Sequence, residues 1–306
     1  MNVLVLGGSG MLGHKIFQIL QERTSDVWCT IRSAANDAWL DDIDLFHGGN
    51  VIWQMDVFGW PRFQDLLRER HPKVIVNCVG VIKQRAAGKD AIPNIELNAL
   101  LPHRLAALAA TWGGRLIHFS TDCVFSGSRG NYSESDPSDA KDLYGKAKFL
   151  GEVDAPNSLT LRTSIIGREL SHFKSLLEWF LQQNHKKVQG YTGAMYSGVT
   201  TNYLANLTAR IIEEQSALSG LYQVTSATIS KYDLLSLIRD AFELDVEIVR
   251  DDQFFCDRSM TGEKFVNATG YRTPSWRELV LQLRQDPTPY ERWRRMEKSS
   301  DKVLRK

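Results

Sequence analysis

The chain has 306 residues, 43% of them hydrophobic and 24% charged, which is the composition of an ordinary soluble globular protein with one large domain or two smaller ones. Its 37 Lys and Arg residues against 36 Asp and Glu leave a formal net charge of +1, so no overall field favours nucleic acid or anionic membrane as a partner. No apolar run approaches the roughly 18 residues that a membrane helix needs. An apolar strand already begins at residue 2, where a leader peptide would lie, and we therefore expect a cytoplasmic protein.

The four cysteines lie far apart in the sequence, at Cys29, Cys78, Cys123 and Cys256. They form no C-x-x-C pair and have no histidine cluster beside them. This pattern favours reduced cysteines over a disulfide framework. It also supplies no ligand set for a metal ion, and no metal site is expected.

Short apolar segments alternate with amphipathic ones in the first half of the chain. Strands are expected at residues 2–7, 27–32, 51–56, 73–80, 115–120 and 158–167. Helices are expected from Leu12, with Ile16, Ile19 and Leu20 on one face, then with Leu97, Leu101, Leu105 and Leu108 on one face, and at residues 143–153. Pro102 should kink the second of these helices or mark its first turn. The alternation predicts an α/β fold with a doubly wound parallel Rossmann sheet.

The rhythm changes at about Gly167, which predicts a smaller C-terminal α/β domain. Its expected elements are a long helix around 175–183, a glycine-containing loop at 189–198, a helix at 203–214, a strand at 220–226, a helix opened by Ser230 and Asp233, a strand at 245–250, and a solvated terminal helix at 289–306. We assign residues 1–166 to the first domain and residues 167–306 mainly to the second, with some segments returning to the first.

A glycine-rich segment joins the first strand to its helix. Gly7, Gly10 and Gly13 are spaced G-x-x-G-x-x-G, which lets the backbone turn tightly and approach a pyrophosphate at the helix N-terminus. The residues expected to bind a dinucleotide here are Gly7, Ser9, Gly10, Met11, Leu12 and Gly13. A structural turn without a ligand is the alternative.

Residues at the carboxyl ends of the next strands should complete this cofactor site. Arg32 ends the second strand where a carboxylate would select NAD, and an arginine suits the 2′-phosphate of NADP. NADPH is therefore the expected cofactor, with NADH as an alternative, unless Arg32 is only a surface charge. Asp56 is placed to accept from the adenine amino group. The further expected contacts are Val57, Cys78, Val79 and Gly80.

A tyrosine and a lysine lie four residues apart, at Tyr144 and Lys148, which places them on one face of a helix. A tyrosine has a reference pKa near ~10, and a lysine ammonium one turn away favours its phenolate form. The same lysine could also bond the nicotinamide ribose. Such a pair can serve proton transfer. A chance pair on a surface helix is the alternative, and the preceding glycine segment and Thr121, at the end of the fifth strand, argue against it.

Four motifs in this order resemble those of the extended short-chain dehydrogenase/reductase superfamily, and most closely its dTDP-4-dehydrorhamnose reductase group. They are G-x-x-G-x-x-G from Gly7, S-T-D-x-V-F-x-G from Ser120, Y-x-x-x-K from Tyr144 and R-T-S from Arg162. Looser likenesses follow in Y-S-G-V-T-T near Ser197 and C-D-R-S-M-T-G near Arg258, and Asn98 matches a helix asparagine common in the superfamily.

The resemblance implies an NADPH-dependent reductase that acts on the 4-keto group of a nucleotide-activated 6-deoxy sugar for polysaccharide precursor synthesis. It assigns Thr121, Tyr144 and Lys148 to catalysis, with Tyr144 as the proton donor. It assigns Thr121, Asp122 and Arg258 to substrate binding, Arg258 over the diphosphate. For Arg258, an ion pair with Asp257 that shapes a loop is the alternative.

Two departures leave the substrate open. Dehydratases of the superfamily carry T-D-E, whereas Cys123 stands at the third position here. The usual R-T-S-W has Ile165 in place of the tryptophan. The sugar is thus dTDP-4-dehydrorhamnose or a UDP-2-acetamido-2,6-dideoxy-hexos-4-ulose. The competing functions are an NAD-dependent nucleotide-sugar epimerase and a non-catalytic NADP-binding regulatory subunit, and the protein is expected to be a monomer or a homodimer.

Overall fold

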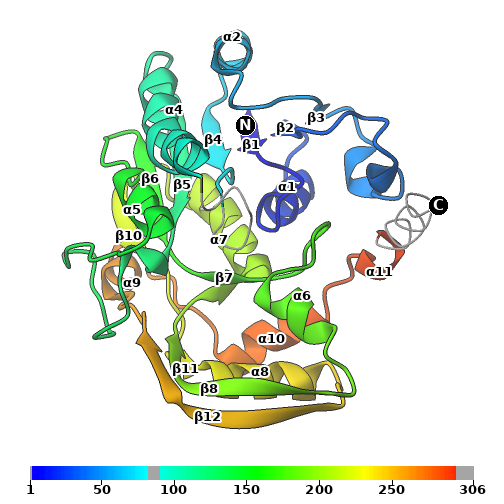
Figure 1. Ribbon diagram of the computed structural model, residues 1–306. Helices are drawn as coiled ribbons and strands as arrows, with labels where there is room; N and C mark the ends of the chain where they lie inside the picture. Colours follow the sequence, from blue (N-terminus) through cyan, green and yellow to red (C-terminus); the bar gives the residue numbers. More distant parts are fainter. Residues whose placement is uncertain (1, 82–89, 294–306) are drawn as a thin grey trace.

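The computed structural model describes residues 2–81 and 90–293, and its centre is a seven-stranded sheet with the strand order β10-β6-β5-β4-β1-β2-β3 (Figure 1). All neighbouring strands of this sheet run parallel. The strands are β1 Val3–Leu6, β2 Val27–Thr30, β3 Val51–Ile52, β4 Val74–Asn77, β5 Arg115–Ser120, β6 Ser158–Arg162 and β10 Gly220–Gln223. The doubly wound parallel sheet predicted from the sequence is confirmed.

Helices cover both faces of this sheet, as the continuous apolar runs of its strands require. Val3 and Val5 of β1 pack into the core under α1 and α7, whereas Leu4 and Leu6 point to the opposite core under α2 and α4. Figure 1 shows α1 and α7 on one side of the sheet and α4 and α5 on the other. The bounds are α1 Gly13–Gln21, α2 Trp60–Arg70, α4 Leu101–Ala110, α5 Leu143–Leu150 and α7 Thr201–Glu214. Short helical segments are η1 Ala38–Leu40, η2 Asp44–Phe46, α3 Ala91–Pro93 and η5 Asp122–Val124.

Pro102 lies in the first turn of α4, directly after the π-helical segment η4, Asn94–Leu100. The helical backbone runs on from η4 into α4, since the Leu101 N–H bonds the Glu96 carbonyl, and the wider π-helical turn leaves room for a proline ring that has no N–H. Of the two outcomes expected for Pro102, the start of a helix is the one observed.

A second, smaller sheet lies below the first in Figure 1, with the order β11-β8-β12. Its strands are β8 Lys186–Tyr196, β11 Ile229–Ser230 and β12 Val246–Asp257, and its helices are α6 Leu176–Leu181, α8 Lys231–Ala241 and α10 Trp276–Arg284. A separate core that includes Leu234, Ile238 and Leu279 fills the space between sheet and helices. The remaining elements are β7 Ile165–Ile166, β9 Val199–Thr200, α9 Glu263–Thr269 and α11 Tyr290–Trp293.

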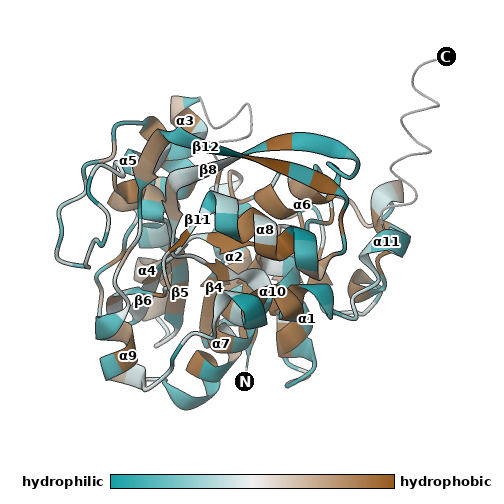
Figure 2. Ribbon diagram, turned by 90° about the horizontal axis from the view of Figure 1, so that it is seen from below, coloured by the Kyte–Doolittle hydropathy of each residue, from teal (hydrophilic) through white to brown (hydrophobic). Residues whose placement is uncertain are grey.

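The prediction of a loop at residues 189–198 was wrong, because most of this segment forms strand β8. Its glycines serve close packing: a Cβ on Gly190 would lie 2.6 Å from Ile248 Cγ2, and one on Gly193 would lie 2.6 Å from the Phe254 carbonyl oxygen. The strand expected at 245–250 is longer than predicted: it continues to Asp257 and pairs with β8 over most of its length. In Figure 2, β8 and β12 carry both hydrophilic and hydrophobic stretches, as expected for a sheet with one face toward solvent.

Other boundaries also differ from the expected ones. The third strand ends at Ile52 rather than at residue 56, because Gln54 adopts a left-handed conformation with φ 52°. The expected strand 158–167 is divided into β6 and β7. The expected long helix at 175–183 has six residues.

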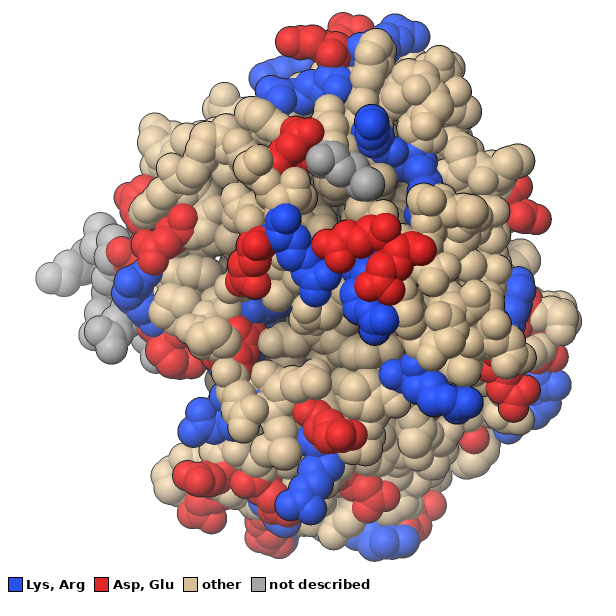
Figure 3. All heavy atoms as spheres, turned by 180° about the vertical axis from the view of Figure 1, so that it is seen from behind, with Lys and Arg blue, Asp and Glu red and all other residues tan. Residues whose placement is uncertain are grey.

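Segments of the second half of the chain pack with the first half. Strand β10 extends the large sheet beside β6, and α7 packs on α1. The domain boundary at residue 166 stays a prediction. On the face drawn in Figure 3, acidic and basic side chains are interspersed. Within the described ranges, no helix has both the length and the apolar character needed to cross a membrane.

The segment before α11 binds to the helix that follows the glycine loop. Lys15 of α1 forms a 2.7 Å ion pair with Asp286, and both side chains are buried. Thr288 Oγ1 accepts a second hydrogen bond from Lys15. The Tyr290 hydroxyl lies 2.8 Å from His14 Nε2. Tyr290 and Trp293 are buried, so this part of the terminal helix, which was expected to be solvated, packs against the protein instead. The remainder of that expected helix lies outside the described residues.

We predict that Asp286→Ala lowers the free energy of unfolding by about 3–5 kcal/mol, because it leaves the Lys15 ammonium buried without its partner. Urea denaturation measures this change. Glu247→Ala is the control, since it removes an ion pair with Lys187 whose side chains are 65% and 62% exposed, and it should cost less than about 1 kcal/mol. Equal effects of the two substitutions would contradict the prediction.

Candidate active site

The glycine loop packs so tightly that side chains are excluded. Gly7 has φ 78°, a conformation that favours glycine, and its carbonyl accepts a hydrogen bond of 2.9 Å from the Gly10 N–H. A Cβ on Gly13 would lie 2.1 Å from the Gly7 carbonyl oxygen. This geometry lets the backbone at the start of α1 approach a phosphate group closely, and the loop therefore fits a dinucleotide.

The end of β4 lies directly against the loop. A Cβ on Gly7 would be 3.1 Å from Val79 Cγ2, and a Cβ on Gly13 would be 3.4 Å from Cys78 Cβ. Asn98 of η4 holds the backbone of Val81, because its side-chain amide accepts from the Val81 N–H at 3.1 Å and donates to the Val81 carbonyl at 3.0 Å. The loop and the end of β4 thus form one surface at the carboxyl edge of the sheet.

Arg32 and Asp56 follow β2 and β3 at the same edge, and both are exposed. Asp56 Oδ1 accepts a hydrogen bond of 3.0 Å from the Phe58 N–H, so it caps its own turn instead of ending a strand as expected. Val57 beside it is buried. For Arg32, no hydrogen bond or ion pair is formed with the described residues. The cofactor contacts assigned to Arg32 and Asp56 stay predictions.

Thr121 and Tyr144 meet where β5 ends and α5 begins. The Asp142 side chain caps α5 by accepting from the Gly145 N–H at 3.0 Å. Gly145 lets the helix approach η5, since a Cβ there would lie 2.2 Å from the Cys123 carbonyl oxygen. The Thr121 side chain lies close enough to the Tyr144 hydroxyl to lower its pKa, but burial outweighs this effect and raises the pKa of Tyr144. The net shift is opposite to the one expected from Lys148, and it keeps the phenol protonated and able to donate a proton.

Lys148 is buried one turn further along α5. Its Nζ donates to the Phe119 carbonyl at 2.6 Å and lies 3.5 Å from His118 Nε2. Burial lowers the pKa of Lys148 to about 8, against the opposing charge of Glu152. The lysine can therefore change its charge close to neutral pH.

Sequence reasoning missed the buried polar groups that surround Lys148. His118 is a polar residue inside an otherwise apolar strand, and Glu152 is four residues after Lys148, so both were visible as sequence signals. Glu152 forms a bidentate pair with Arg162 at 2.8 and 2.7 Å and accepts from Ser120 Oγ at 2.6 Å. The R-T-S motif therefore contributes a buried ion pair behind α5.

A pocket of about 420 Å³ opens beside Cys123 and is lined by Phe125, Ser126, Gly127, Ser128, Lys141, Asp142, Phe255 and Arg258. Arg258 reaches it because Gly127 has no side chain: a Cβ there would lie 3.0 Å from Arg258 Cγ. Arg258 Nε donates to the Phe125 carbonyl at 2.9 Å. Asp257 instead accepts from the Ser259 N–H at 2.9 Å, so the alternative ion pair between Asp257 and Arg258 is not formed.

Asp122 is buried between Thr121 and this pocket. Thr121 Oγ1 donates to Asp122 Oδ1 at 3.0 Å. Burial raises the pKa of Asp122, while the nearby Arg258 acts in the opposite direction. The contact orients the Thr121 hydroxyl, and it places a carboxyl group within the same cluster as Arg258.

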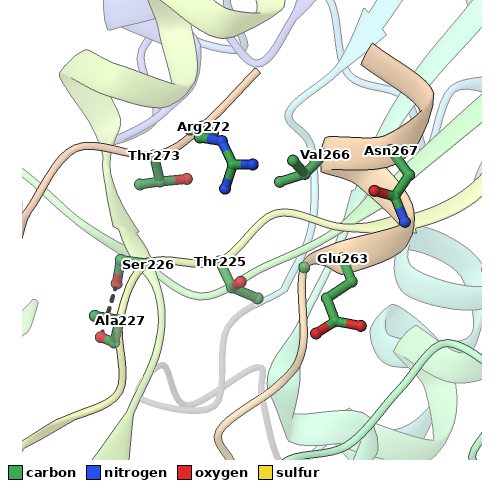
Figure 4. A pocket seen from close by; sticks show the side chains of 9 residues that line it. Thr225, Ser226, Ala227, Glu263, Val266, Asn267, Arg272 and Thr273 are labelled. Carbon is green, nitrogen blue, oxygen red and sulfur yellow. Dashed lines mark hydrogen bonds between the residues drawn. The ribbon is translucent and has the colours of Figure 1, made fainter. Parts of the chain in front are cut away.

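A second hollow, of about 560 Å³, shares no lining residue with this pocket. In Figure 4, Arg272 projects into it from one side, with Glu263, Val266 and Asn267 of α9 on the other. None of the site residues predicted from the sequence lines it. Of the predicted site residues, Arg258 lines the first pocket. Thr121, Asp122 and the half-buried Tyr144 lie within two residues of its lining residues Cys123 and Asp142, and the buried Lys148 lies one turn further along α5.

Comparisons with known proteins agree with this arrangement. The chain is 30% identical over 251 residues to the dTDP-4-dehydrorhamnose reductase of Aggregatibacter actinomycetemcomitans, which covers 78% of each protein. It is 26% identical over 255 residues to the methionine adenosyltransferase 2 subunit beta of Danio rerio, covering 79% of this chain and 74% of that protein. The solved dTDP-4-dehydrorhamnose reductase of Bacillus anthracis in complex with NADP has the same fold, with a TM-score of 0.72 at 18% identity over 92% of this chain and 98% of that chain.

The family described as RmlD substrate binding domain matches residues 1–285. This match confirms the resemblance to the dTDP-4-dehydrorhamnose reductase group that the motifs indicated. The chain belongs to the RmlD substrate binding domain family.

Proposed function

We propose that this protein is an NADPH-dependent reductase of the 4-keto group of a nucleotide-activated 6-deoxy sugar, serving polysaccharide precursor synthesis. One observation carries the proposal: Tyr144 lies close to Thr121 and stays protonated, one helical turn from the buried Lys148 and at the same carboxyl edge of the sheet as the glycine loop. This is the arrangement that carbonyl reduction needs, since it joins a proton donor to a dinucleotide site.

The residues divide the reaction between them. Bound NADPH supplies the hydride to the carbonyl carbon. Tyr144 donates its phenolic proton to the carbonyl oxygen. The Thr121 hydroxyl, which donates to Asp122 in this structure, turns to donate to the same carbonyl oxygen when the substrate binds. Lys148 then offers a nearby positive charge that stabilises the phenolate left on Tyr144.

The substrate is inferred from the pocket beside these residues. Arg258 lines it, and its two terminal nitrogens form no hydrogen bond or ion pair within the described part of the chain, which suits a diphosphate. A curated relative that shares 30% of its sequence is named dTDP-4-dehydrorhamnose reductase, and this supports a 4-keto-6-deoxy sugar. Both dTDP-4-dehydrorhamnose and a UDP-2-acetamido-2,6-dideoxy-hexos-4-ulose satisfy these requirements.

Cys123 argues against a dehydratase. It occupies the position at which dehydratases of the superfamily carry a glutamate, and burial raises the pKa of its thiol to about 12. A neutral thiol is a poor acid and a poor base at neutral pH. Sugar dehydration would need another base that this position does not supply.

A second candidate is a non-catalytic NADP-binding regulatory subunit. The observation that favours it is the 26% identity to a protein named methionine adenosyltransferase 2 subunit beta. NADPH oxidation measured against a panel of enzymatically prepared 4-keto nucleotide sugars separates the two. Turnover of one sugar supports the reductase, whereas NADPH binding without turnover of any of them supports the subunit.

Tyr144→Phe should reduce kcat on the order of 10²–10⁴-fold, because it removes the proton donor without changing the shape of the site. Lys148→Met should lower kcat and weaken NADPH binding together. Steady-state kinetics and a fluorescence titration with NADPH measure the two effects, and circular dichroism checks folding. Near-normal turnover of the phenylalanine variant would rule out the catalytic assignment.

Arg32→Ala should raise KM for NADPH and leave KM for NADH nearly unchanged, since only NADPH carries the 2′-phosphate. A charged hydrogen bond of this kind is worth roughly 1.5–3 kcal/mol. Arg68→Ala is a matched control, because Arg68 is an exposed arginine on α2 whose side chain is 57% exposed. Equal changes for both cofactors would show that Arg32 does not distinguish them.

Arg258→Ala should raise KM for the nucleotide sugar ten-fold or more, about 1.4 kcal/mol, while the NADPH dissociation constant stays constant. Arg258→Lys should recover part of the loss, because lysine keeps the charge but cannot form the bidentate contact. Arg250→Ala is the control, because Arg250 lies on β12, the strand that ends just before Arg258, and its side chain is 64% exposed. If Arg258→Ala lowers the thermal stability and leaves KM for the nucleotide sugar unchanged, the role of Arg258 is structural instead.

A further inference from the structure

His118 is a fully buried histidine that the proposed reaction does not use. It lies on β5, on the face that packs under α5, and its Nε2 is 3.5 Å from Lys148 Nζ. Its other ring nitrogen, Nδ1, is 3.1 Å from Asn77 Nδ2 at the end of β4. The imidazole therefore bridges the end of the central strand and the lysine of the candidate active site.

The direction of these hydrogen bonds is set by the backbone. The Val79 N–H can only donate, and it donates to Asn77 Oδ1 at 3.1 Å. The amide nitrogen of Asn77 must then face His118, and an amide nitrogen can only donate. His118 Nδ1 is consequently the acceptor, so a neutral ring carries its proton on Nε2.

This proton points toward the lysine. An ammonium group has donors only and cannot accept it, whereas an uncharged amine can. The Phe119 carbonyl, at 2.6 Å, accepts from Lys148 in either charge state. The surroundings of Nζ therefore offer one acceptor and one donor, which match the amine.

Charged and titratable groups act on this pair from each neighbouring element. Glu152, two residues after the end of α5, favours the ammonium, whereas Cys78 after β4 stays a neutral thiol. Burial lowers the pKa of His118 well below its usual range. Lys148 on α5 and His103 on α4 act in the same direction, because each opposes a positive charge on the imidazole. The ring is thus neutral at pH 7, and its tautomer decides which form of the lysine it favours.

We propose that His118, held in its Nε2–H tautomer by Asn77, is a positioning residue that presents a hydrogen-bond donor to Lys148 and so favours the uncharged amine. The inference rests on the proposed function only for its effect on turnover, since the hydrogen-bond chain Val79–Asn77–His118–Lys148 exists without substrate. Loss of the donor should leave Lys148 more strongly protonated.

The test is an NMR titration of protein carrying ¹³Cε-labelled lysine, with the Lys148 signal assigned by its absence in Lys148→Met. In His118→Leu the midpoint of the Lys148 titration should rise by about one pH unit, a tenfold change in proton affinity. Thr160→Val is the matched control: Thr160 is a fully buried polar residue opposite His118 on β6, and its hydroxyl bonds only Val153 among the described residues. The midpoint of the Lys148 titration in Thr160→Val should equal that of the unaltered protein.

A second measurement needs no variant. Spectra of ¹⁵N-histidine-labelled protein report which ring nitrogen of His118 carries the proton, and Nε2 is expected. A proton on Nδ1, or an unchanged Lys148 midpoint in a folded His118→Leu variant, would overturn the proposal. If the reductase activity is absent, both NMR results still stand, so failure of the proposed function and failure of this inference are distinguishable.

Discussion

The burial of the Lys148 amino group, which can be charged or neutral near neutral pH, is the constraint around which the candidate active site is organised. A charge removed from water is costly unless hydrogen bonds and opposite charges compensate for it. Here the Phe119 carbonyl is the direct partner, and Glu152, two residues after the end of α5, supplies the opposing charge. The Phe119 carbonyl is available because it lies at the carboxyl end of β5, and Glu152 is itself held in place by Arg162 of β6.

The same edge of the sheet positions the groups that a dinucleotide would meet. β1, β4 and β5 are parallel neighbours, so their carboxyl ends fall side by side. The glycine loop follows β1, Cys78 follows β4 and packs against Gly13, and Thr121 follows β5. Ligands bind such sheets in the crevice at the carboxyl ends of the strands, and the buried apolar faces on both sides keep this edge in register.

How far the sequence could lead is clear from particular residues. Strand β1 was predictable because both its faces are buried and its residues are continuously apolar, and β5 because Leu116, Ile117 and Phe119 are apolar on both faces of the sheet. The pair Tyr144 and Lys148 was predictable because helical spacing places both on one face. Strand β8 was not, since Gly190 and Gly193 are turn residues in most contexts, and only the partner strand β12 and helix α8 show that they serve close packing. The Phe119 carbonyl could not be predicted at all, because a backbone group leaves no residue-type signal.

The charge states of the two catalytic candidates point in one chemical direction. Burial raises the pKa of Tyr144, so the phenol keeps its proton at neutral pH, which suits a group that must give a proton to a carbonyl oxygen. Burial lowers the pKa of Lys148 to about 8, so its charge is easily lost or gained. The same desolvation thus acts in opposite senses on the acid and on the base of the pair, because it disfavours the charged form of each. A site built in this way needs no acidic residue at position 123, where the neutral thiol of Cys123 lies, and it is better suited to reduction than to dehydration of a sugar.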